Sequence, residues 1–183
     1  MTRLLLFATG SVLLIAVSRK SLLRPRSHGF YRFFAWEAIL ALILLNAPAW
    51  FRDPLALRQL ISWVLLTVSF LPLLYGVQSL RRQGRPGGTR AGDRSLLAFE
   101  TTTSLVTTDI YALIRHPLYA SLLLLAWGVF FKVLSWMSGL LVAAATLFLV
   151  ATARADEAEC IRFFGEEYRT YMRKTKMFIP YIL

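Results

Sequence analysis

Residues 118–150 read LYASLLLLAWGVFFKVLSWMSGLLVAAATLFLV, and this apolar run decides the fold. As one helix it would be about 50 Å long at 1.5 Å per residue, whereas the hydrocarbon core of a bilayer is about 30 Å thick. The run must therefore fold back on itself, and Lys132, Ser135 and Gly139 mark the corner. The stretch predicts a hairpin of two membrane helices, of which the first is short.

The composition of the whole chain agrees with a membrane protein. Hydrophobic residues make up 57% and charged residues 17% of the 183 residues, whereas about a quarter of a soluble domain is charged. We expect an all-α integral membrane protein. The net charge of +11 could suggest a nucleic-acid partner, but the cations lie between apolar segments. We therefore expect the chain to interact with the bilayer and not with nucleic acid.

Three further apolar segments precede the hairpin, at residues 4–17, 30–50 and 57–80. The first is short and is followed by Ser18-Arg19-Lys20, whereas a signal peptide carries its charge before the apolar core. An uncleaved first helix is expected, although cleavage after Ala16-Val17-Ser18 stays open. Together with the hairpin, these segments predict five membrane-spanning helices.

The distribution of cations supports this count. All but four of the 21 Lys and Arg residues fall in alternate connections, at 18–32, 81–116 and after residue 150. Cytoplasmic loops carry an excess of Lys and Arg. We therefore expect the N-terminus outside, and the C-terminus and the active site on the cytoplasmic side.

We expect a single membrane domain over residues 1–183. Residues 1–80 would form three spans, 81–116 a cytoplasmic loop with a cofactor motif, and 117–183 the hairpin and a catalytic segment with a short C-terminal helix. Residues 81–94 are rich in glycine and arginine and predict a flexible loop. This loop either gathers anionic headgroups or only determines the orientation.

Two motifs of polar residues flank the hairpin. Before it stands Thr107 to Ala120, TTDIYALIRHPLYA, in which Pro117 suits the first turn of a helix. After it come the acids Asp156 and Glu157 and then residues 164–171, FGEEYRTY. Gly165 is expected to end the last membrane helix, and Glu166 and Glu167 to begin a short one, where acids are favourable.

This ordered set resembles the isoprenylcysteine carboxyl methyltransferase family, whose superfamily includes the phospholipid N-methyltransferases. The family pattern is Thr-x-x-Leu-x-Thr-x-Gly-x-Tyr-x-x-x-Arg-His-Pro-x-Tyr, a paired acid, Phe-Gly-x-x-Tyr-x-x-Tyr and a terminal Pro. Two positions depart from it, since Asp109 replaces the usual glycine, and Met177 stands where many members have arginine.

The resemblance implies an enzyme that uses S-adenosylmethionine, with cofactor contacts at the Arg-His-Pro-x-Tyr motif and the paired acid. The residues themselves supply a cation for the carboxylate, an acid for the ammonium and tyrosine rings that attract a sulfonium. Glu157 shares a helix face with Ile161 and Phe164, so we expect it to face the bundle and to bind the ammonium. The expected cofactor-binding residues are Arg115, His116, Tyr119, Glu157, Tyr111, Thr108 and Tyr168.

Methyl transfer to an amine needs a base, for which Glu157 and His116 are the candidates, whereas a carboxylate acceptor needs a cation. No metal ligand is predicted. The expected acceptor is a lipid or lipidated small molecule, such as an isoprenylcysteine carboxylate or a phospholipid amine. An NADPH-dependent membrane reductase of the sterol-reductase type and a non-catalytic binding protein remain alternatives. The oligomeric state is left open.

The other polar residues receive simpler interpretations. His28, in a basic loop, is expected to be solvated. Glu37, inside the second segment, is expected either to pair with Arg32 or to extend toward the membrane surface, although an acid at such a position is also a functional candidate. Cys160, the one cysteine, is expected to be a small buried hydrophobic residue.

Overall fold

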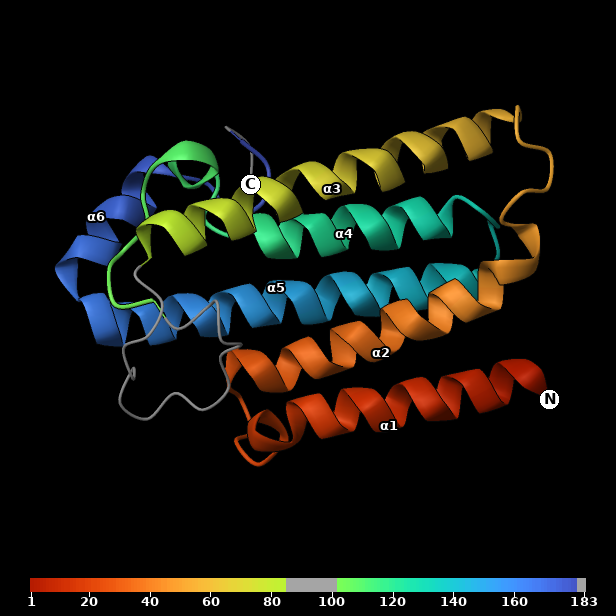
Figure 1. The fold of residues 1–183 in the computed structure, drawn as a ribbon, viewed down its shortest axis with the longest axis horizontal. Helices are drawn as coiled ribbons and strands as arrows, with labels where there is room; N and C mark the ends of the chain where they lie inside the picture. The colour runs from red at the N-terminus through yellow and green to blue at the C-terminus, as the bar shows by residue number, and fades with distance from the viewer. Residues whose placement is uncertain (85–101, 181–183) are drawn as a thin grey trace.

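The computed structural model describes residues 1–84 and 102–180. Figure 1 shows long helices that run lengthwise beside one another, with the short C-terminal helix at one end. The elements are α1 (Thr2–Leu22), α2 (His28–Asn46), the 3-10 helix η1 (Ala47–Ala49), α3 (Leu57–Gln83), the 3-10 helix η2 (Asp109–Ala112), α4 (Pro117–Phe130), α5 (Trp136–Phe164) and α6 (Glu166–Lys174).

Local signals set the helix boundaries. The side chains of Ser27 and Ser135 accept hydrogen bonds from Phe30 N and Ser138 N, and so cap the starts of α2 and α5. Pro117 opens α4. Gly165, with φ +61°, separates α5 from α6, as expected. The predicted hairpin corner is confirmed at Lys132 and Ser135, since residues 131–135 join α4 to α5, whereas Gly139 lies inside α5.

The predicted all-α class is confirmed for the part of the chain that the structure describes, but the count of five spans is not. Four helices, α1, α2 with η1, α3 and α5, are long and apolar enough to cross a membrane. Helix α4 is apolar but has 14 residues, about 21 Å at the usual rise. The predicted loop at 81–94 begins inside α3, and from residue 85 it lies outside the described residues.

Small residues bring the helices close together. Ala35 and Leu42 of α2, and Ala145 and Leu149 of α5, are fully buried in the core that these helices share. At Gly128 of α4, an added Cβ would lie 2.9 Å from Leu66 Cγ of α3. Close helix packing by small residues replaces the hydrophobic driving force that is weak between helices in lipid.

A buried cation joins the helices at the end of the bundle that holds the α4–α5 turn. Lys132 is fully buried, and its Nζ donates to Gln59 Oε1 at 3.0 Å. The same ammonium lies 3.4 Å from the ring centroid of Trp63 and 5.3 Å from that of Trp50. Burial and the nearby Arg58 lower the pKa of Lys132. These contacts tie the α4–α5 turn to α3 and η1.

Helix α1 packs along α2 (Figure 1). Between them, Ser11 Oγ donates to Glu37 Oε2 at 2.8 Å. The hydrogen-bond partner of the Glu37 carboxylate is therefore a serine of α1, whereas the sequence had suggested Arg32 as one candidate. Polar side chains of this kind hold neighbouring helices together inside a bilayer.

Candidate active site

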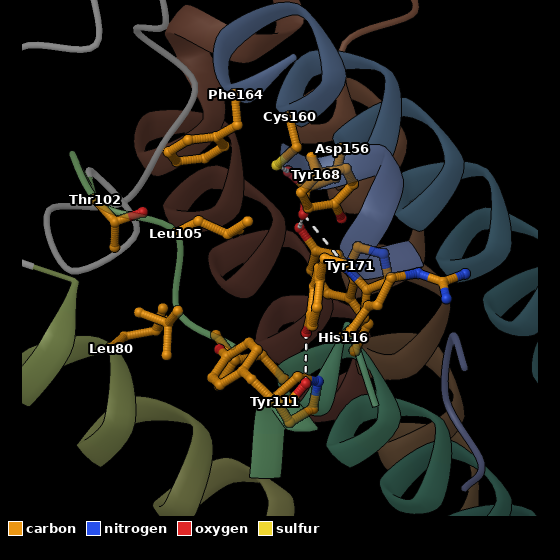
Figure 2. Close-up of a pocket in the computed structure, with 15 residues that line it drawn as sticks. Leu80, Thr102, Leu105, Tyr111, His116, Asp156, Cys160, Phe164, Tyr168 and Tyr171 are labelled. Carbon is orange, nitrogen blue, oxygen red and sulfur yellow. Dashed lines mark hydrogen bonds and ion pairs between the residues drawn. The ribbon is translucent and has the colours of Figure 1, made fainter. Parts of the chain in front are cut away.

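A pocket lies where the C-terminal ends of α3 and α5 meet η2, the start of α4 and α6. The cavity has a volume of about 100 Å³, and the whole hollow, including its open mouth, has about 660 Å³ of empty space. Its described lining is Leu80, Thr102, Leu105, Val106, Tyr111, Arg115, His116, Pro117, Leu118, Tyr119, Asp156, Cys160, Phe164, Tyr168 and Tyr171. Figure 2 shows the labelled Leu80 and Leu105 across the hollow from His116 and Asp156.

The Arg-His motif is fixed through its backbone. Arg115 N donates to Lys176 O at 2.8 Å, and His116 N donates to Met177 O at 3.1 Å. Ile114 and Lys176 form a parallel bridge beside these bonds. The segment after α6 therefore holds the entrance of α4, and Met177 acts here through its carbonyl group.

Arg115 and Glu157 form a buried ion pair. Arg115 Nε donates to Glu157 Oε1 at 2.7 Å, and both side chains are 10% exposed. Arg115 Nη1 also donates to the backbone carbonyls of Met172 and Thr175. The guanidinium is thus held by α5 and by the end of α6, which is an arrangement suited to fixing the site.

His116 lies between the two paired acids. Its Nδ1 is 3.5 Å from Asp156 Oδ2, and its Nε2 is 3.4 Å from Glu157 Oε1. Burial alone would lower the pKa of His116, but the hydrogen bonds to Asp156 and Glu157 and the two negative charges raise it above its ordinary value. These contacts therefore favour the imidazolium form of His116.

Four tyrosine side chains also line the pocket. The rings of Tyr119 and His116 are stacked with centroids 5.3 Å apart, and Tyr119 Oη donates to Asp156 Oδ2 at 3.3 Å. Tyr171 Oη donates to the carbonyl of Tyr111 at 2.6 Å. Burial raises the pKa of Tyr168 and Tyr171, so both remain neutral phenols that present aromatic surface.

The opposite wall of the pocket is apolar. Leu80 from α3, Leu105 and Val106 from the segment before η2, and Phe164 from α5 contribute to it. Cys160 also lines the pocket, half-buried, and its Sγ donates to Asp156 Oδ1 at 3.7 Å. The pocket therefore combines one charged and aromatic wall with one hydrocarbon wall.

The structure brings most of the predicted site residues together, although their roles stay predictions. Arg115, His116, Tyr119, Tyr111 and Tyr168 line the pocket. Two predicted residues, Glu157 and Thr108, are not among the lining residues. Glu157 lies behind Arg115 and His116. The Thr108 hydroxyl donates to Gln83 Oε1 on the exposed surface, so the structure does not place it as a cofactor contact.

Two lining residues were not predicted as site residues. Asp156 is next to Glu157 in the chain, and consecutive residues of a helix point about 100° apart, yet Asp156 is the acid that borders the pocket. Tyr171 completes the aromatic wall. The sequence could have predicted Tyr171 as a site residue, because it is the last residue of the distal motif Phe-Gly-x-x-Tyr-x-x-Tyr.

Asp109, which replaces the usual glycine, has a left-handed backbone with φ +54°. Glycine adopts this conformation without strain, and aspartate tolerates it better than most residues. The carboxylate accepts hydrogen bonds from Ser79 Oγ at 3.0 Å and Gln83 Nε2 at 2.8 Å. Asp109 therefore ties η2 to the end of α3.

The prediction that His28 is solvated was wrong. His28 is fully buried, and its Nδ1 is hydrogen-bonded to the carboxylate of Glu159. Its backbone N also donates to Glu159 Oε1 at 3.0 Å. The contact joins residues 131 positions apart, so the local basic sequence gave no sign of it.

Comparison with known proteins identifies methyltransferases as relatives. The chain is 29% identical over 75 residues to methanethiol S-methyltransferase 1 of Bradyrhizobium diazoefficiens, which covers 41% of this chain and 26% of the relative. It is 34% identical over 79 residues to protein-S-isoprenylcysteine O-methyltransferase of Schizosaccharomyces pombe, covering 43% and 34%. A methanethiol S-methyltransferase of Pseudomonas deceptionensis is 29% identical over 79 residues, covering 42% and 29%.

No family model and no solved structure matches the chain. The matches span about a third or less of the relatives' own lengths. These relatives and the four apolar helices fit a membrane methyltransferase, and do not favour the reductase alternative. The predicted resemblance is thereby confirmed: the chain has homologues, at low identity over less than half of its length, in the isoprenylcysteine carboxyl methyltransferase family.

Proposed function

We propose that the pocket binds S-adenosylmethionine and that the protein transfers its methyl group to a nucleophile from the lipid phase, at the cytoplasmic face. The observation that carries this proposal is one cavity in which His116, Asp156 and four tyrosines face an apolar wall. S-adenosylmethionine supplies an activated methyl group on a sulfonium. The chain then has to hold and orient the two reactants, which can contribute about 7–11 kcal/mol.

The described residues fit this donor. Asp156 offers a carboxylate to its cationic groups, and the tyrosine rings offer a surface that attracts a sulfonium. Arg115 is already bound to Glu157 and to two backbone carbonyls. We therefore assign Glu157 a positioning role, in which it holds Arg115 and His116. The contact with the cofactor's ammonium, which was expected of Glu157, is assigned to Asp156 instead.

The acceptor that suits the pocket best is a thiol with an apolar substituent. A carboxylate acceptor would need a cation, and the Arg115 guanidinium is engaged within the protein. A thiol instead needs an apolar surface for its substituent and a carboxylate that accepts its proton. Leu80, Leu105 and Asp156 offer these. The names of two relatives cited above, which are methanethiol S-methyltransferases, agree with this choice.

Titration and methyl transfer with detergent-purified protein test the proposal. We expect S-adenosylhomocysteine to bind and NADPH not to bind. With methyl-labelled S-adenosylmethionine, label should appear in an alkyl thiol in preference to an isoprenylcysteine carboxylate or a phospholipid amine. Binding of NADPH alone would favour the reductase, and binding of neither would favour a non-catalytic protein. Label in the carboxylate alone would contradict the choice of acceptor.

A further inference from the structure

A second cluster of ionisable groups lies between the pocket and the protein surface. It consists of His28 at the start of α2, and Asp156 and Glu159 on adjacent turns of α5. One polar atom from each residue lies within 4.8 Å of the other two. His28 is fully buried, and its Nε2 has no hydrogen-bond partner among the described residues.

The two carboxylates of this cluster have different surroundings. Asp156 lines the pocket and touches Tyr119 and His116. Glu159 does not line the pocket, and its side chain is 10% exposed. Residues three apart on a helix are neighbours, so α5 presents one acid to the pocket and the other toward the outside, with His28 beside both.

We propose that Asp156, His28 and Glu159 form the route by which the acceptor's proton leaves the pocket, an inference that rests on the proposed function. When a thiol is methylated, its S–H bond breaks and a new S–C bond forms. The old bond between the methyl carbon and the sulfonium sulfur breaks, and its electron pair remains on that sulfur. The products are a methyl thioether, S-adenosylhomocysteine and one proton, which passes to Asp156.

The proton has to leave Asp156 before the next reaction cycle. An imidazole ordinarily binds a proton more tightly than a carboxylate does, so His28, which lies beside Asp156, can take up the proton and release one through its contact with Glu159. Separations of up to 4.8 Å allow direct contact after a small side-chain movement, or a bridge through one water molecule. His28 already shares a hydrogen bond with Glu159, whose side chain is partly exposed.

The cluster also has a structural role, and the experiment must separate the two. Glu159 accepts the His28 N–H and so helps to cap α2. Loss of a cap would lower the rate with every acceptor alike. Loss of a proton route would lower the rate only with acceptors that reach the pocket protonated.

The test compares two thiol acceptors of similar size, an alkyl thiol that is mostly protonated at neutral pH and an aryl thiol that is mostly ionised. We expect His28→Gln and Glu159→Gln to lower kcat with the alkyl thiol by at least about a hundredfold, the lower end of proton-transfer effects. The rate with the aryl thiol and the affinity for S-adenosylhomocysteine should stay close to those of the wild type. Ser27→Ala is the matched control, because it removes the α2 cap without removing a proton carrier.

Equal losses with both thiols in His28→Gln and Glu159→Gln, like those in Ser27→Ala, would overturn the proton route in favour of a structural role. Loss of wild-type activity on chelation, with zinc bound by the wild type and not by His28→Gln, would overturn it in favour of a metal site. If the wild type binds S-adenosylhomocysteine but methylates neither thiol, the proposed acceptor is wrong and the proton route falls with it.

Discussion

Arg115 and Glu157 are 42 positions apart in the chain, yet Arg115 Nε donates to Glu157 Oε1 at 2.7 Å, behind the wall of the pocket. The pair joins the entrance of α4 to the end of α5. Two backbone carbonyls at the end of α6 complete the surroundings of the guanidinium. This contact therefore holds together the three elements that form the charged wall.

Glu157→Gln should destabilise the protein. Gln keeps the shape but leaves Arg115 without a counter-charge, so we expect a loss of about 2–4 kcal/mol in the free energy of unfolding, near the range for breaking a buried pair. Denaturant unfolding in detergent measures it. Glu166→Gln is the control, because its exposed pair with Arg169 should contribute under about 0.5 kcal/mol. Equal losses of unfolding free energy in Glu157→Gln and Glu166→Gln would show that the buried pair contributes no more stability than the exposed one.

Asp156→Asn removes the proposed proton acceptor and should also weaken cofactor binding. We expect the affinity for S-adenosylhomocysteine to fall by about tenfold, or about 1.4 kcal/mol, through loss of the pocket carboxylate. Titration calorimetry measures the change. Glu157→Gln provides the comparison, and its binding loss should be the smaller of the two once both proteins are shown to be folded. A larger loss of affinity in Glu157→Gln than in Asp156→Asn would assign the cofactor contact to Glu157.

The stability of the protein should depend on His116 in a defined pH range. Because the two acids raise the pKa of His116 in the folded state, its contribution is fully present below about pH 6.5, the ordinary value. It is lost as the pH rises through the higher folded value. Thermal melts of wild type and His116→Gln from pH 5 to 9 should therefore converge toward the alkaline end. A difference in Tm that grows with pH would contradict this sign.

Substitutions at Asp109 should separate backbone strain from hydrogen bonding. Asp109→Gly and Asp109→Ala both remove the bonds to Ser79 and Gln83. Only glycine relieves the left-handed conformation at φ +54°, so the glycine variant should be more stable than the alanine variant by about 1 kcal/mol. Chemical denaturation of both proteins provides the comparison, and equal stabilities would mean that this turn relaxes in solution.

The expected orientation can be tested by cysteine labelling in a Cys160→Ala background. Leu23 lies after α1 and Leu55 lies before α3, and both side chains are 83% exposed. Cysteines at Leu23 and at the exposed Arg173 should be labelled from the cytoplasmic side, and a cysteine at Leu55 from the opposite side. Labelling of Leu23 and Arg173 from different sides would refute the proposed topology.

The sequence predicted the helices well because their signals are local. The apolar runs, Pro117 and Gly165 each determine a helix or its end through neighbouring residues. The Arg-His-Pro-x-Tyr motif likewise predicted much of the pocket, since its residues are close together in the chain. The division of roles between Asp156 and Glu157 could not be predicted, because it depends on where α6 and η2 pack against α5. The burial of His28 depends on Glu159 in the same way.

The buried ammonium of Lys132 has a consequence for how the chain enters the membrane. In the expected orientation, the turn that carries Lys132 has to be carried across the bilayer during insertion, where a lysine without partners is costly. Gln59 and Trp63, which receive the ammonium, belong to the first turns of α3. Helix α4 is also too short to span about 30 Å by itself. Biogenesis should therefore insert α3 first, and then α4 and α5 together as one hairpin.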